Sequence, residues 1–157
     1  MSLDLIGTYR DHPILLQEVI GLDDLAVDDV SHAVVLLWLG GNSWGRGQLE
    51  RAVKRFASKS VLSLTVAGEL ADEAFSIVLE TLGSLPTRKH IMTGIIRDTE
   101  VRDLEEDALI VKDAVEEFLT GTWPDEARFD EWTQYRIIVT GQPELSRCIR
   151  QSSWPLT

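Results

Sequence analysis

Seven consecutive apolar residues, Ala33 to Leu39, are the sequence feature that most constrains the fold of this chain. A strand with one solvated face alternates apolar and polar residues, whereas a strand that is buried on both faces reads as a continuous apolar run. Gly40 and Gly41 follow the run directly and are typical of the end of a strand. We therefore expect a strand of a parallel sheet that is covered on both of its faces.

Further apolar runs alternate with helix-like patterns along the rest of the chain. The strands that we predict are residues 33–39, 61–66, 91–96 and 135–140. The helices that we predict lie within residues 49–56, 71–82, 103–118 and 143–149. Such alternation is typical of parallel sheets with right-handed crossovers. It predicts the α/β class, as a three-layer Rossmann-like or flavodoxin-like domain with a mostly parallel sheet of at least four strands, whose order the pattern leaves open.

The first 32 residues stand outside this alternation. Asp11 and Pro13 are typical of the cap and the first position of a helix, so we expect a short helix over residues 14–20. The aspartates that follow indicate a solvated turn. The chain has 157 residues, a usual length for one domain. We therefore expect residues 1–32 to be an N-terminal extension packed on a single α/β domain, residues 33–157.

The formal net charge of −11 argues against two classes of partner. An acidic surface repels nucleic acid and anionic membranes, so we expect no nucleic-acid partner and no membrane partner. No stretch approaches the roughly 20 apolar residues of a membrane span, and we see no signal peptide. Cys148 is the single cysteine, which fits a reducing, cytoplasmic location. A basic protein is the partner that the charge favours, and the oligomeric state stays open.

A glycine-rich loop after the first predicted strand is the best candidate for a ligand site. Parallel sheets bind ligands outside the carboxyl ends of their strands, and glycines there let the backbone approach a phosphate at a helix N-terminus. Residues that follow the other strands would join the loop at this edge. The candidate ligand-binding residues are Gly41, Asn42, Ser43, Gly45, Arg46, Gly47, Glu69, Asp98 and Gln142. The loop is neither a P-loop nor G-x-G-x-x-G, so a structural turn is the alternative.

Residues for catalysis or metal binding are not indicated. The sequence lacks H-E-x-x-H, and no pair of acids shares an ordered ligand spacing with a histidine. His32 and His90 each precede a predicted strand, which places them at the edge opposite the glycine-rich loop. We therefore name no catalytic residue, no metal site and no cofactor, and we favour a protein that is not an enzyme.

Residues 97–131 carry thirteen acids and four bases, a local net charge of −9. The segment 122–132, which overlaps the end of this acidic stretch, is longer than a helix-to-strand connection needs. It is also rich in aromatic residues. The candidate interaction residues are Trp123, Phe129, Glu131 and Trp132. Two interpretations stay open: the aromatic residues cover an edge of the sheet, or at least one of them is partly exposed as an anchor for a partner protein.

The order of these pieces resembles an uncharacterised family of small bacterial α/β domains of unknown function. The matching residues are Val34 to Gly41, Ile91-Met92-Thr93 before the acidic helix, and Trp132-x-x-Tyr135 leading into Ile138 and Gly141. The resemblance covers roughly residues 33–142. It implies the α/β fold and no activity.

Two functional hypotheses follow. The first is a non-enzymatic protein-interaction or immunity-type accessory protein that acts through an acidic, aromatic surface. The alternative is a nucleotide- or phosphate-ligand-binding Rossmann-like domain that uses loop 40–47. A fold alone does not choose between them.

Overall fold

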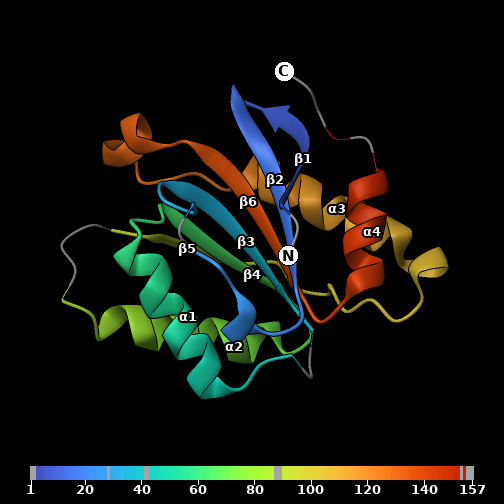
Figure 1. Cartoon of the computed structure of the whole chain (residues 1–157), viewed down its shortest axis with the longest axis horizontal. Coiled ribbons are helices and arrows are strands. Elements are labelled where there is room, and N and C mark those ends of the chain that lie inside the picture. Colours follow the sequence, from blue (N-terminus) through green and yellow to red (C-terminus); the bar gives the residue numbers. More distant parts are fainter. Residues whose placement is uncertain (1–2, 28, 41–42, 87–89, 153, 155–157) are drawn as a thin grey trace.

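The computed structural model describes residues 3–27, 29–40, 43–86, 90–152 and 154, which one mixed sheet organises (Figure 1). Its strands are β1 Leu3–Tyr9, β2 His12–Val19, β3 Ala33–Leu39, β4 Ser63–Gly68, β5 Met92–Ile95 and β6 Gln134–Thr140. They lie in the order β1-β2-β6-β3-β4-β5. β1 is antiparallel to β2, and the other neighbouring pairs are parallel. The predicted α/β class with a mostly parallel sheet is confirmed.

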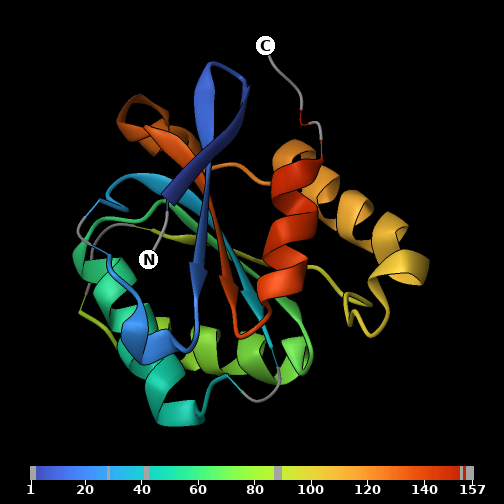
Figure 2. The ribbon, with the colours of Figure 1, turned by 45° about the vertical axis from the view of Figure 1, so that its right-hand side comes forward.

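Helices pack on both faces of this sheet (Figures 1 and 2). They are α1 Arg46–Ser58 and α2 Ala71–Gly83 on one face, and α3 Leu104–Gly121 and α4 Pro143–Gln151 on the other. The side chains of β3 alternate between two apolar cores. Val35 and Leu37 pack with α1 and α2, whereas Leu36 and Trp38 pack with α3 and α4. All seven residues of β3 are buried, which explains the continuous apolar run.

The helix predicted over residues 14–20 is wrong. Residues 12–19 form β2, which pairs with β1 in a hairpin and with β6 in parallel. Ile14 and Leu16 point into one core and Val19 into the other, which is the period of a strand. Backbone pairing on both sides and burial on both faces outweigh the local helix signal. The N-terminal strands therefore belong to the same sheet as the later ones.

A buried arginine fastens the segment that follows β2. Arg136 in β6 is buried, and its guanidinium donates to the side-chain oxygens of Gln17 and Gln134 at 2.8 to 3.0 Å. It also donates to the backbone oxygen of Asp29 at 3.0 Å and to the Asp29 carboxylate at 3.3 Å. Burial lowers the pKa of Arg136 from its ordinary value, and Asp29 opposes that shift. The expected solvated turn is therefore held against the sheet at Asp29.

The parallel strands give the sheet two distinct ends. The carboxyl ends of the parallel strands lie at one end, the carboxyl edge, and their amino ends lie at the other, the amino edge. From β3 the chain proceeds through β4 to β5 on one side, while β6 is added on the other side. The ends of β3 and β6 therefore form a topological switch point, where ligands of open parallel sheets bind.

Candidate functional site

A cavity of about 320 Å³ opens at the switch point. Its lining residues are Ile20, Gly40, Ser43, Glu69, Val101, Gly141 and Gln142. Three of the predicted ligand residues, Ser43, Glu69 and Gln142, thus lie together. Gly41 and Asn42 lie outside the described residues.

Ser43 fastens the glycine-rich loop to the end of β6. Its backbone N–H and its hydroxyl donate to the carbonyl oxygen of Gly40 at 3.0 and 2.6 Å, and the hydroxyl lies 2.6 Å from that of Thr140. Gly141 has a φ of 65°, and a Cβ there would lie 2.8 Å from the Cβ of Ser43. Glycine is needed at this position because the two loops touch. The Ser43 hydroxyl is therefore part of the turn that closes this corner.

The loop also contains G-x-S-x-G, Gly41 to Gly45, a pattern that our sequence reasoning missed. In hydrolases with this pattern, the serine occupies a strained strand-to-helix turn and is activated by a histidine. Ser43 is not among the described non-glycine residues with positive φ. The three histidines, His12, His32 and His90, lie at the amino ends of strands, on the opposite edge. None of the three histidines is therefore placed where it could act as a general base for Ser43.

The remaining loop residues build the start of α1. Gly45 is the N-cap of this helix, and Gly47 lies in its first turn. Arg46 pairs with Glu50 at 3.6 Å and with Glu80 of α2, and it does not line the switch-point cavity. Arg46, which we expected to bind a phosphate, therefore joins α1 to α2 instead.

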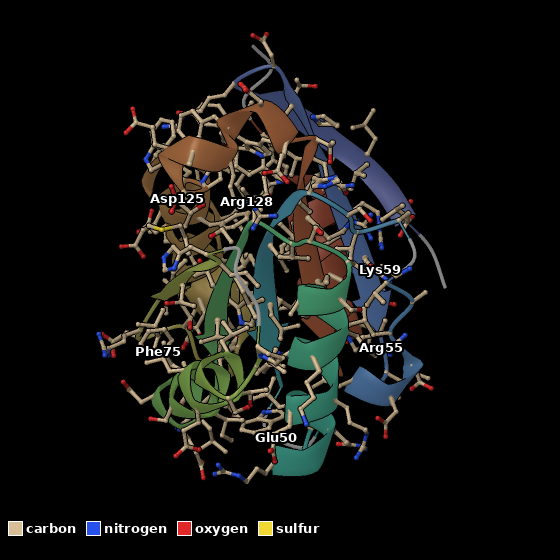
Figure 3. The ribbon with its side chains drawn as sticks, turned by 90° about the vertical axis from the view of Figure 1, so that its left-hand side faces the viewer. Glu50, Arg55, Lys59, Phe75, Asp125 and Arg128 are labelled. Carbon is tan, nitrogen blue, oxygen red and sulfur yellow. The ribbon has the colours of Figure 1, made fainter. Side chains whose placement is uncertain are left out.

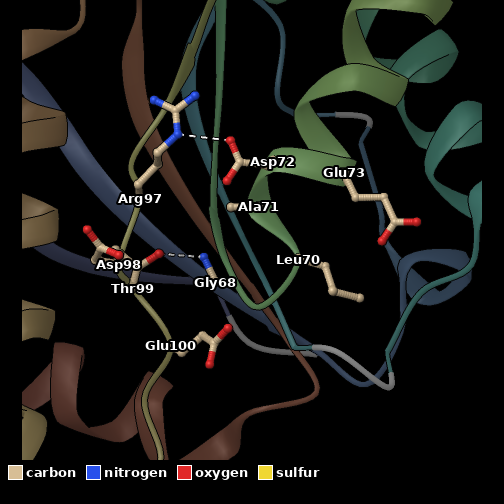
Figure 4. Close-up of a pocket in the computed structure, with 9 residues that line it drawn as sticks. All are labelled: Gly68, Leu70, Ala71, Asp72, Glu73, Arg97, Asp98, Thr99 and Glu100. Atoms are coloured by element: carbon tan, nitrogen blue, oxygen red, sulfur yellow. Dashed lines mark hydrogen bonds and ion pairs between the residues drawn. The ribbon is translucent and has the colours of Figure 1, made fainter.

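Asp98 lines a different cleft, of about 590 Å³, at the ends of β4 and β5 (Figure 4). Its charged lining residues are Asp72, Glu73, Arg97, Asp98 and Glu100. Arg97 donates to the Asp72 carboxylate at 2.9 Å, so the cation of the cleft is already paired. The Thr99 hydroxyl accepts from the backbone N–H of Gly68 at 2.7 Å and links the two strand ends. With four carboxylates against one arginine, this cleft disfavours a phosphate.

The insert between α3 and β6 lies at the amino edge, opposite the cavities. Trp123 and Phe129 are each 42% exposed, and their rings stack with centroids 6.1 Å apart and planes inclined by 19°. Arg10, in the β1–β2 turn, lies over Trp123 with its guanidinium carbon 3.5 Å from the ring centroid. We call Arg10, Trp123 and Phe129 the aromatic surface. The predicted partial exposure of at least one aromatic is present, whereas its role in binding stays a prediction.

Glu131 holds the insert to the domain. It pairs with Arg128 at 3.2 Å, and Arg128 is buried. The Arg128 guanidinium also donates to the backbone oxygens of His90 at 3.1 Å and Ser60 at 3.4 Å. Figure 3 shows Arg128 at the end of the domain opposite Glu50 of α1. Glu131 therefore neutralises a buried cation, a role that the sequence did not indicate.

Trp132 is likewise packed inward. Its ring stacks on His12 with centroids 4.1 Å apart, and its Nε1 donates to the carbonyl oxygen of Gln134 at 3.2 Å. Of the four predicted interaction residues, Trp123 and Phe129 face solvent, while Glu131 and Trp132 fix the insert in place.

The helix that leads into the insert has an acidic exposed face. The exposed acids of α3 are Glu105, Glu106, Asp113, Glu116 and Glu117. At the C-terminus of α3, the Arg10 guanidinium donates to the carbonyl oxygens of Leu119 and Thr120 at 3.2 Å each. These bonds connect the acidic helix with the aromatic surface.

Within the described ranges, no three or more His, Cys, Asp or Glu side chains gather so as to hold a metal ion. In the same residues, no helix combines the length and the apolar character that crossing a bilayer requires. Comparison with known proteins gave no match to a family model and no match to a curated protein.

Proposed function

We propose that this chain is a non-enzymatic interaction protein, of the accessory or immunity type, which binds a basic protein partner through its acidic, aromatic surface. The observation that carries the proposal is the stacked, half-exposed pair Trp123 and Phe129, with Arg10 over the ring of Trp123. Tryptophan and arginine are enriched among the residues that dominate binding energy at protein interfaces.

The aromatic surface is ordered before any partner arrives. Trp123 contacts Phe129, Trp132 and Arg10 at once. Arg10 in turn is held by the two carbonyl oxygens at the end of α3. Side chains that are already fixed lose less conformational entropy on association, so this arrangement favours an anchor for a partner.

The charge around the aromatic surface favours a basic partner. Of the five acids that α3 exposes, Glu116 and Glu117 lie near the helix C-terminus, where Arg10 binds, and the chain has a formal net charge of −11. Acids at the rim of an interface mainly accelerate association with a cationic protein, and salt screens their effect. Binding is therefore expected to weaken as salt rises.

The test is capture of partners by the immobilised protein, from a lysate of the cells that produce it, at low and high salt. The wild type is compared with the double variant Trp123→Ala/Phe129→Ala. The control is Leu79→Ala, which truncates a similarly exposed apolar side chain on α2. We expect a basic protein to bind the wild type and the control, with about thirtyfold weaker binding to the double variant. Capture of no basic protein, or equal affinity for all three, contradicts the proposal.

A nucleotide- or phosphate-binding domain is the alternative, and the cavity at the switch point favours it. The order β5-β4-β3-β6 also supports a three-layer Rossmann-like arrangement over a flavodoxin-like one, since it follows the 3-2-1-4 pattern. The pairing of Arg46 with Glu50 and Glu80 opposes a phosphate ligand. Calorimetry with nucleotides separates the hypotheses. Binding that Arg46→Ala weakens supports the alternative, whereas no heat, or equal affinity, retires it.

A further inference from the structure

A second cavity at the carboxyl edge, which we call the carboxyl-edge groove, lies at the end of β2. It has a volume of about 570 Å³ and is lined by Glu18, Val19, Ile20, Asp24, Gly141 and Pro143. Ile20 and Gly141 also line the switch-point cavity, so the two cavities are adjacent. Ile20 is 84% exposed, more than any other large apolar side chain in the described residues. The groove thus presents an apolar surface to solvent.

The floor of the groove is fixed by the backbone. The N–H of Gly141 donates to the carbonyl oxygen of Val19 at 2.8 Å, which joins the ends of β6 and β2. Val19 is buried in the core, and Pro143 begins helix α4. A site that is formed in advance needs little reorganisation to accept a ligand.

Two carboxylates at the groove have no cation partner among the described residues. Within the described residues, the side chains of Glu18 and Asp24 have no salt-bridge or hydrogen-bond partner. The neighbouring Asp23, by contrast, accepts from Gln48 at 2.9 Å and from Arg51 at 3.2 Å. The described lining of the groove and of the switch-point cavity includes no lysine or arginine.

We infer that the carboxyl-edge groove binds a peptide segment of a partner protein in which an apolar side chain lies between lysine or arginine residues. The apolar side chain packs against Ile20 and Pro143, and the cations pair with Glu18 and Asp24. A small monocation would neutralise one of these carboxylates and leave the other unpaired, and an anion would be repelled. The groove and the aromatic surface lie at opposite edges of the sheet, so this inference is independent of the proposed function.

The probe is the short peptide acetyl-Lys-Leu-Arg-amide, titrated into nitrogen-15-labelled full-length protein while amide chemical shifts are recorded by NMR. We expect shifts at Gly21, Gly141 and Glu144, and none on α3 or the insert. Acetyl-Glu-Leu-Glu-amide should cause no shifts. Butylamine, which supplies one cation and an apolar chain, should bind much more weakly than the basic peptide.

Two groove variants, Ile20→Ser and Glu18→Gln/Asp24→Asn, are compared with two controls of matched chemistry. Leu79→Ser removes an exposed leucine elsewhere, and Glu105→Gln/Glu106→Gln removes two charges from α3. We expect the peptide affinity to fall about tenfold in each groove variant and to stay unchanged in the controls.

The inference is overturned by the absence of shifts, by shifts centred on α3, or by equal losses in groove and control variants. Butylamine that binds as tightly as the peptide also overturns it, in favour of a small-molecule site. None of these variants changes the aromatic surface, so failure here leaves the proposed function standing. Failure of the partner-capture experiment likewise leaves the groove standing.

Discussion

Arg10 lies over the indole ring of Trp123, with its guanidinium carbon 3.5 Å from the ring centroid. The same guanidinium donates to the carbonyl oxygens of Leu119 and Thr120 at the end of α3. Arg10 has a φ of 50°, a left-handed conformation that is unfavourable for a long side chain. Its side-chain interactions offset that cost. One residue therefore joins the β1–β2 hairpin, α3 and the insert.

We expect Arg10→Ala to lower the free energy of unfolding by about 1–3 kcal/mol, because it removes two hydrogen bonds at a helix C-terminus and a cation–π contact. Arg10→Lys keeps the charge but loses the forked donor, so its loss should be smaller. Urea unfolding followed by tryptophan fluorescence measures both. The control is Arg102→Ala, since Arg102 is exposed and pairs with Glu100 at the surface. An equal loss in this control would contradict the role given to Arg10.

The central strands could be predicted because their signal lies within each strand. The seven residues of β3 are buried on both faces, so they are all apolar whatever surrounds them in sequence. The signal of β2 is different, because its pairing partner β6 lies more than a hundred residues away along the chain. The local features at Asp11 and Pro13 favour a helix, whereas the segment forms a strand because it pairs with β1 and β6 in the folded protein.

The same distinction applies to the candidate site. Arg46 next to glycines suggested a phosphate site, but its partner Glu80 lies on another helix. Glu131 was a candidate interaction residue, but it pairs with Arg128, whose guanidinium donates to the backbone oxygens of two residues that are distant in sequence. Partial exposure of at least one aromatic residue of the insert could be predicted from the unusual length of this connection.

The pair Glu131 and Arg128 leads to a prediction about stability. Glu131→Gln leaves the buried Arg128 guanidinium without its neutralising carboxylate, so we expect a loss of about 1–3 kcal/mol in the free energy of unfolding. The isosteric control Asp130→Asn changes the exposed neighbouring acid and should have an effect within about 0.5 kcal/mol. Denaturant unfolding measures both variants. Equal stability of Glu131→Gln and the wild type would show that the ion pair contributes nothing to the fold.

Asp107 gives a prediction about pH. Its carboxylate accepts from the backbone N–H groups of Arg102 at 3.0 Å and Asp103 at 3.2 Å, and these bonds lower the pKa of Asp107 from its ordinary value of 3.8. A carboxyl group with a lowered pKa stabilises the fold above its unfolded pKa, and the contribution is lost as pH falls through the folded pKa. The stability difference between wild type and Asp107→Asn should therefore shrink below pH 3.8. A difference that stays constant on acidification would contradict this.

Leu70 and Leu79 provide a matched test of backbone strain at the carboxyl edge. Leu70 is the N-cap of α2 and has a φ of 58°, whereas Leu79 lies within the same helix. The two side chains are similarly exposed, at 52% and 47%, so replacing either with asparagine removes a similar apolar contact. Asparagine tolerates the left-handed conformation and is a good N-cap, but it is a poor residue in a helix interior.

We therefore expect Leu70→Asn to raise the free energy of unfolding by about 0.5–1 kcal/mol, and Leu79→Asn to lower it by about 0.5 kcal/mol. Thermal and urea unfolding of the two variants measure the difference. If both substitutions destabilise the protein equally, the left-handed backbone at Leu70 stores no strain that a better residue could relieve. If only Leu70→Asn raises the free energy of unfolding, the backbone at residue 70 adopts a conformation that leucine disfavours.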